Sequence, residues 1–223
     1  MDTNKKNICE LIRLYVEKDK SIYDAMNQAV AYAQGDFILF MNCGDMFYQE
    51  DVLQKVSESI EQQTDKEKLV LYGDTYGEKN GVFIKAAPKI TGFTCYRNIP
   101  CHQSCIYAAK LCKEKPYDAQ YKIRADYDHF LWCFYEAKAK MVNVNLTIAS
   151  YEGGGYSESK ENRKRDKQEH KAITAKYMAV GELLKYKMVM LLTLAPLRSF
   201  MAENEALSGV YHKVKDIVYR RQA

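Results

Sequence analysis

The sequence alternates between segments with helix-like and strand-like apolar spacing, and this alternation limits the folds open to it. Apolar residues recur every three or four positions over 21–33, and a short apolar run follows at 37–41. A second helical pattern covers 52–60. Two strand-like runs follow: one over 69–72, which ends at Gly73-Asp74, and one from residue 81. This order predicts an α/β fold in which helices cover both faces of a sheet.

The rest of the chain continues the pattern with less regular connections. Residues 86–104 contain prolines and a glycine and are expected to be irregular, whereas 126–137 has the apolar spacing of a helix. Short strands are expected at 141–145 and 147–150, and a charged helix from about residue 158. We therefore expect one core domain over residues 1–157 and a helical tail over residues 158–223.

Charge and cysteine content argue against two kinds of site. A net charge of +4 in 223 residues is too small to indicate nucleic-acid binding. The cysteines near His102 lack the tight pairs that zinc sites usually show. The chain opens with the polar segment MDTNKKN rather than an apolar leader, so a cytoplasmic protein with free thiols is expected.

Acidic residues stand at the ends of several predicted elements: Asp24, Asp45, Asp126 and Asp128. A single acidic residue in such a place is most often a helix cap or a solvated turn. The loop Asn42-Cys43-Gly44-Asp45, however, follows a predicted strand, and α/β sheets bind ligands beyond the carboxyl ends of their strands. The sequence therefore predicts a ligand site at this loop.

Five segments in order resemble the catalytic core of family 2 glycosyltransferases, which have the GT-A fold. They are SIYDAMNQAVAYAQGDFILFMNCGDMF from residue 21, YGD from 72, IPCHQS from 99, YKIRADYDHFL from 121 and YEGGGYS from 151. The resemblance covers residues 21–157, and it is greatest to bacterial enzymes that build capsule, exopolysaccharide or O-antigen. It implies a GT-A-like mixed sheet with flanking helices.

The same resemblance implies transfer of a sugar from a nucleotide diphosphate sugar to a saccharide or lipid-linked saccharide acceptor. Mg²⁺ or Mn²⁺ would neutralise the departing diphosphate, and Asp45 is the expected metal ligand. Asp126 is the expected general base that accepts the proton of the acceptor hydroxyl. Many relatives carry an aspartate where this chain has Asn42, which predicts weaker metal binding.

The remaining site residues are also assigned by resemblance. Donor contacts are expected from Asp19, Asp24, Asn27, Asn42, Gly44 and Asp45. Acceptor or phosphate contacts are expected from His102, Gln103 and Asp128. Four of them have a plainer interpretation as well: Asp24 and Asn27 as helix surface, His102 as a loop residue, and Asp128 as a first-turn charge that faces the helix dipole.

Family members normally begin with an apolar strand and a later strand that ends in a DGxSxD segment, and neither is recognised here. The core is therefore expected to be N-terminally truncated, with weak donor binding unless the missing segment is supplied. Two functions stay open: an active glycosyltransferase, or a non-catalytic remnant that acts, if at all, as a binding protein. A nucleotidyltransferase is a weaker third, because no glycine-rich basic loop opens the chain.

The tail combines an apolar stretch, residues 188–197, with basic residues on both sides. These are Lys185, Lys187, Arg198, Lys213, Lys215, Arg220 and Arg221. The apolar stretch is too short to span a bilayer but suits an interfacial helix on the inner face of the cytoplasmic membrane. The alternative is that its leucines pack on the catalytic domain or on a second subunit.

Overall fold

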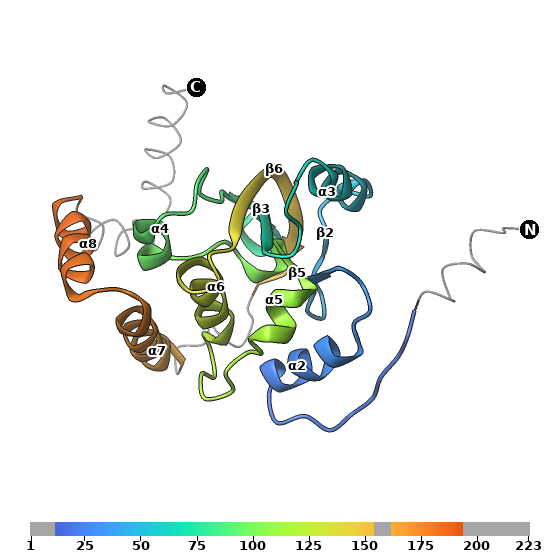
Figure 1. Cartoon of the computed structure of the whole chain (residues 1–223), viewed down its shortest axis with the longest axis horizontal. Helices are drawn as coiled ribbons and strands as arrows, with labels where there is room; N and C mark the ends of the chain where they lie inside the picture. The colour runs from blue at the N-terminus through green and yellow to red at the C-terminus, as the bar shows by residue number, and fades with distance from the viewer. Residues whose placement is uncertain (1–11, 154–161, 194–223) are drawn as a thin grey trace, which may run out of the picture. The chain divides into compact units, whose positions relative to one another are not determined.

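The computed structural model describes residues 12–153 and 162–193. The chain forms two compact units, Met1–Ile173 and Thr174–Ala223. In the first unit, helices flank both faces of one mixed sheet (Figure 1). This is the α/β architecture that the sequence predicts. The predicted domain boundary at residue 157 stays a prediction, although compactness groups residues through Ile173 with the core.

The elements of the first unit follow one another as the periodicity indicates, with some additions. The strands are β1 (Phe37–Leu39), β2 (Met46–Phe47), β3 (Leu69–Gly77), β4 (Val82–Ile84), β5 (Cys105–Ala108) and β6 (Lys140–Tyr151). The helices are α2 (Ile22–Tyr32), α3 (Val52–Glu61), α4 (Gly92–Arg97), α5 (Ala109–Glu114), α6 (Ala125–Tyr135) and α7 (Asn162–Tyr177), with 3-10 turns η1 (Glu78–Asn80) and η2 (His102–Ser104). Helix α7 ends in the second unit, where α8 (Val180–Leu192) follows.

The sheet has the strand order β1-β5-β3-β6-β2, and β4 also pairs with β3. Strands β3 and β6 are parallel, and the other pairs of this sheet are antiparallel. Because β5 runs between β1 and β3 and opposes both, β1, β3 and β6 share one direction. Their carboxyl ends therefore meet at the same edge of the sheet, where the loop after β1 lies.

Strand β3 is longer than the sequence predicts. It does not stop at Gly73-Asp74 but continues to Gly77. Strand β6 bends toward it here: a Cβ atom on Gly73 would lie 2.4 Å from the carbonyl oxygen of Leu146. The two short strands expected at 141–150 are likewise one strand, with Asn145 at a φ of 53° in its irregular middle.

Residues 86–104 are more ordered than the sequence predicts. Thr91 and Thr94 form a reciprocal capping box that starts α4, and η2 follows the prolines. Strand β5 and helix α5 were not predicted, because the run CIYA is too short to show a period and passes directly into the helix. Strand β5 completes the centre of the sheet, where Leu71 of β3 pairs with Ile106.

The sheet separates two apolar layers. On one face, Leu69, Leu71 and Ile148 pack against Val52 and Val56 of α3. Because side chains alternate along a strand, the neighbouring residues face the opposite layer, where α5 and α6 lie (Figure 1). There His129 of α6 lies between the rings of Tyr107 and Tyr117, each centred 5.2 Å away. Burial lowers the pKa of His129 to about 4, so it stays neutral in the core.

Several predicted features lie outside the described residues. These are the start of the charged helix at 158–161, Gly154 and Gly155, Leu194, and the basic residues from Arg198 to Arg221. None of the helices in the described part of the chain has the length and apolar character needed to cross a membrane.

Candidate active site

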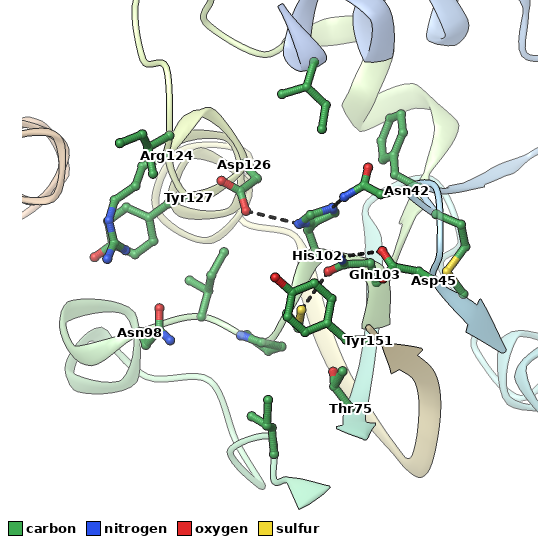
Figure 2. A pocket seen from close by; sticks show the side chains of 18 of the residues that line it. Asn42, Asp45, Thr75, Asn98, His102, Gln103, Arg124, Asp126, Tyr127 and Tyr151 are labelled. Carbon is green, nitrogen blue, oxygen red and sulfur yellow. Dashed lines mark hydrogen bonds and ion pairs between the residues drawn. The ribbon is translucent and has the colours of Figure 1, made fainter. Parts of the chain in front are cut away.

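A cavity of about 1280 Å³ opens at the edge of the sheet where β1, β3 and β6 end. Its wall includes α2, the loop after β1, the end of β4, α4, η2 and the start of α6 (Figure 2). Both Asp45 and Asp126 line it, although 81 positions separate them in the sequence. The predicted site loop and the predicted base are therefore brought to one place.

Asp45 is aimed into the cavity by a tight turn. Its backbone N–H donates to the carbonyl of Asn42 at 3.1 Å, and Gly44 adopts a φ of 93°. A Cβ atom on Gly44 would meet only the end of the exposed Glu152 side chain, which can move, so it is the positive φ that requires a glycine here. The amide of Gln103 donates to Asp45 Oδ2 at 2.8 Å, which fixes the carboxylate.

Asp126 occupies the first turn of α6 and is 19% exposed. Its Oδ1 lies 2.9 Å from the hydroxyl of Tyr23, which is also 2.5 Å from the carbonyl oxygen of Ile123. Its Oδ2 lies 3.6 Å from Nδ1 of His102. Burial raises the pKa of Asp126, but contact with His102 and then Tyr23 outweighs it, and the pKa lies below its ordinary value. The group is therefore a carboxylate at neutral pH.

Two consecutive residues, His102 and Gln103, join the two carboxylates (Figure 2). Nε2 of His102 lies 3.1 Å from the amide nitrogen of Asn42. An amide nitrogen only donates, so Nε2 accepts and the ring proton of the neutral histidine lies on Nδ1, toward Asp126. The next residue, Ser104, anchors η2 to β3 through the hydroxyl of Thr75 at 2.7 Å.

Asp24 and Asn27, which were expected to bind the donor, do not line this cavity. The carboxylate of Asp24 accepts the backbone N–H of Lys20 at 2.9 Å, just before α2. Both amide atoms of Asn27 bond the backbone of Tyr117 at 2.8 Å, which ties α2 to the segment after α5. Of the acidic residues assigned to the site by resemblance, Asp45 and Asp126 line the cavity and Asp24 does not. Donor contacts from Asp24 and Asn27 remain a prediction.

Asp19 and Asp128 also lie away from the cavity. Asp128 is 1% exposed and pairs with Lys115, Nζ to Oδ2, at 3.4 Å. Side chains two positions apart lie on different sides of a helix, so Asp128 faces the protein interior while Asp126 faces the cavity. Asp19 lines a separate surface pocket formed by residues 13–19 and the outer side of α2.

Sequence reasoning missed several residues that line the cavity. Tyr23 and Glu152 lie inside segments that resemble the family, and Tyr23 shares the helical spacing of Met26 and Val30, which marks it as inward-facing. Lys85 and Arg97 add positive charge to the wall, and Asp74 holds Lys85 at 2.6 Å. Both basic residues come from segments without a motif, so no local pattern marked them.

Asp45 and Glu152 suit a metal ion only when a bound ligand supplies further coordinating atoms. Within residues 12–153 and 162–193, no group of three or more His, Cys, Asp or Glu side chains could hold a metal ion. The carboxylate of Glu152 lies against Gly44, and its backbone N–H lies 3.4 Å from Asp45 Oδ1. Mg²⁺ commonly uses one or two carboxylates together with phosphate oxygens and water. The pair fits that arrangement.

Curated proteins similar in sequence are glycosyltransferases. The chain is 30% identical over 153 residues to the PGL/p-HBAD biosynthesis glycosyltransferases of Mycobacterium bovis (strain BCG) and Mycobacterium tuberculosis (strain H37Ra). The chain is thus related in sequence to glycosyltransferases. The match covers 68% of this chain and 59% of each relative's length.

The fold is similar to that of a solved protein. The crystal structure of S. aureus TarS 1-349 matches with a TM-score of 0.50 and 17% sequence identity, over 68% of this chain and 48% of that one. The similarity confirms the mixed α/β fold with flanking helices. No protein-family model matches the chain.

Proposed function

We propose that this chain is the catalytic core of a family 2 glycosyltransferase of the GT-A type. It would move a sugar from a nucleotide diphosphate sugar to a saccharide or lipid-linked saccharide in bacterial surface polysaccharide synthesis. One observation carries the proposal: Asp45 and Asp126 line one cavity and are linked through the consecutive residues His102 and Gln103. The sequence relationship to glycosyltransferases supports it.

In the proposed reaction, Asp126 takes the proton of the acceptor hydroxyl as that oxygen bonds the anomeric carbon of the donor sugar. The bond from the anomeric carbon to the diphosphate oxygen breaks, and the nucleoside diphosphate leaves with the electron pair. The lowered pKa of Asp126 keeps the base deprotonated at the start. His102 and Tyr23 hold the carboxylate in place, one at each oxygen.

The part of the cavity wall that carries Asp45 would bind the donor diphosphate. Asp45 and Glu152 would hold Mg²⁺ or Mn²⁺, which when bound neutralises the charge that develops on the leaving diphosphate. Lys85 and Arg97 line the same cavity and would add positive charge near the phosphates. Asn42 would shape the loop and, through His102, couple the donor side to the base.

Nucleotide release from a panel of nucleotide diphosphate sugars, with Mn²⁺ or Mg²⁺, tests this proposal. We expect saturable release by the longest in-frame gene product that contains this chain. Asp45→Asn should lower kcat/KM at least about tenfold, because it removes a metal ligand. Asp36→Asn is the control, since Asp36 is exposed and lies outside the cavity. A protein that neither turns over nor is stabilised by any donor would support the non-catalytic alternative.

We also propose that α8 contacts the cytoplasmic face of an anionic membrane. Five of its apolar side chains are between 60% and 79% exposed and form one stripe: Val180, Leu184, Met188, Leu191 and Leu192. At about 100° per residue, they fall within about 120° of the helix circumference. Lys185 and Lys187 lie just beyond either side of this stripe, where their ammonium groups can reach lipid headgroups.

Liposome flotation tests the membrane proposal. We expect binding to vesicles that contain anionic phosphatidylglycerol and none to neutral phosphatidylcholine vesicles, because each basic residue near an anionic surface adds about 1 kcal/mol. The double variant Leu184→Ser and Leu191→Ser should abolish flotation, whereas the control Glu182→Gln should retain it. A protein that ignores anionic vesicles and forms dimers that this double variant dissociates would show instead that the stripe packs on a second subunit.

A further inference from the structure

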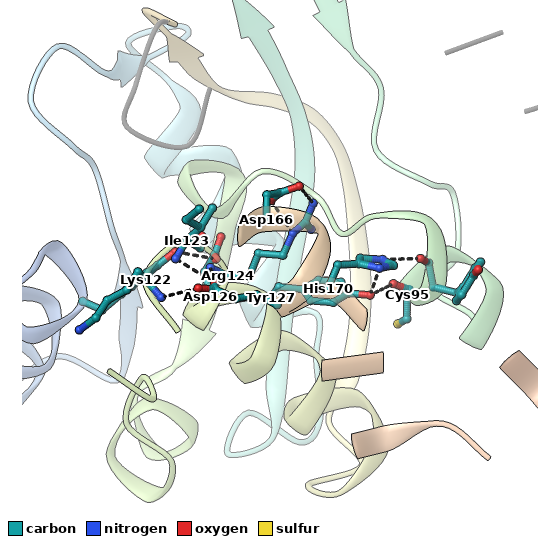
Figure 3. Close-up of polar contacts among 11 residues, drawn as sticks. Cys95, Lys122, Ile123, Arg124, Asp126, Tyr127, Asp166 and His170 are labelled. Atoms are coloured by element: carbon teal, nitrogen blue, oxygen red, sulfur yellow. Dashed lines mark hydrogen bonds and ion pairs between the residues drawn. The ribbon is translucent and has the colours of Figure 1, made fainter. Parts of the chain in front are cut away.

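Helix α7 contacts the segment that carries Asp126, which the charged sequence of this helix did not predict. Asp166, Glu169 and His170 have the spacing of neighbours on one helical face. Asp166 and His170 point toward Arg124 and Tyr127 (Figure 3), and Glu169 binds the backbone of residues 122–124. Asp166 also lines the cavity itself. The basic residues of α7, such as Arg163, Lys164 and Lys167, are exposed.

Glu169 binds the backbone at the start of α6. It is 8% exposed, and it accepts the N–H of Lys122 at 2.9 Å, of Ile123 at 3.0 Å and of Arg124 at 2.9 Å. Arg124 is the N-cap of α6 and supplies no capping side-chain bond of its own. A carboxylate from a distant helix therefore binds the N–H groups just before the first turn of α6, near the helix end where the dipole favours a negative charge.

Three further contacts hold Arg124 and Tyr127, which lie on either side of Asp126. The guanidinium of Arg124 donates to the carboxylate of Asp166 at 2.6 and 3.0 Å and forms a bidentate ion pair. The ring of His170 stacks on Tyr127 with centroids 5.3 Å apart. The hydroxyl of Tyr127 donates to the carbonyl of Cys95 at 2.6 Å. The position of Asp126 is thus bracketed by residues that α7 holds.

The contacts form a continuous path from Glu169 to the proposed base. Ile123 donates its N–H to Glu169 and offers its carbonyl to the hydroxyl of Tyr23. The same hydroxyl lies 2.9 Å from Asp126. A displacement of the backbone at Ile123 would therefore move both the helix start that carries Asp126 and the hydroxyl that contacts it.

We propose that Glu169 is a positioning residue for Asp126: its carboxylate fixes the backbone of residues 122–124 and thereby directs Asp126 into the cavity. The effect of Glu169 on the rate of sugar transfer rests on the proposed function, whereas its effect on the position of Asp126 does not. A small displacement of a general base lowers the rate of the transfer step more than it weakens substrate binding. The rate of sugar transfer should therefore depend on Glu169 of α7, although Glu169 itself need not contact the substrate.

Glu169→Gln is the decisive variant, because it keeps the side-chain shape while it removes the charge and replaces one acceptor by an amide donor. We expect kcat to fall at least about tenfold, with the donor KM changed less than about threefold. Glu169→Asp retains a carboxylate and should recover part of kcat. The matched control is Glu58→Gln, the same chemical change on the exposed side of α3.

Carbon-13 NMR titration of the Asp126 carboxyl provides a readout that does not need activity. Loss of its contacts with His102 and Tyr23 should raise the pKa of Asp126 in Glu169→Gln relative to the wild type. If both proteins are inactive and this pKa still rises, the positioning stands and the proposed function fails. If kcat and the Asp126 titration are unchanged while only the melting temperature falls, Glu169 is merely structural. Should Glu169→Gln not fold, the same two readouts on Glu169→Asp decide.

Discussion

Asp126→Asn is expected to lower the turnover of sugar transfer by about 10²–10⁴-fold, the usual contribution of a positioned general base. Asparagine has nearly the same shape and can still accept the hydroxyl of Tyr23, which lies 2.9 Å from Oδ1. It cannot take the proton of an acceptor hydroxyl. Donor affinity should change little, because the expected donor groups Asp45 and Glu152 lie on another part of the wall.

Steady-state kinetics with the donor found in the panel, together with direct titration of the nucleoside diphosphate, checks this expectation. Asp51→Asn is the control, since Asp51 forms an exposed pair with Lys55 that contributes little to stability. A variant with wild-type turnover would overturn the assignment of Asp126 as the base. Asp128 is a poor substitute in that event, because it is buried and paired with Lys115.

Gly73→Ala is expected to destabilise the fold by about 3 kcal/mol, at the upper end of the cost of overpacking a core. A Cβ atom would lie 2.4 Å from the carbonyl oxygen of Leu146 and 2.9 Å from a methyl of Ile148. The first neighbour is backbone in the sheet and the second is fully buried, so neither can move away easily. The parallel strands β3 and β6 would have to separate at the centre of the sheet.

Thermal unfolding should show this as a loss of roughly 6–12 °C in Tm. Gly77→Ala is a matched control on the same strand, because its Cβ would meet its nearest neighbour at 3.5 Å, an ordinary contact. Equal melting temperatures for the two variants would contradict the close approach of β6 to Gly73. A difference confined to Gly73→Ala would assign the cost to this contact rather than to lost glycine flexibility.

The sequence predicted the elements whose apolar pattern is long or distinct. Helix α2 follows from the apolar spacing over residues 21–33, and β1 follows from its uninterrupted apolar run. The order of the motifs also predicted that Asp45 and Asp126 belong to one site. These inferences worked because the periodicity of a helix or strand, and the order of motifs, are properties of the chain itself.

The tertiary structure decided which candidates reach the cavity and what holds them there. Nothing local distinguishes Asp126 from Asp128 except the face that α6 buries, and nothing local shows that Asn27 is occupied by the backbone of Tyr117. The partner of the α6 N-terminus, Glu169, lies 45 residues beyond Arg124. Hydrogen bonds and close approaches of this kind join residues far apart in the chain, so they leave no period in the sequence and exist only once the elements have packed.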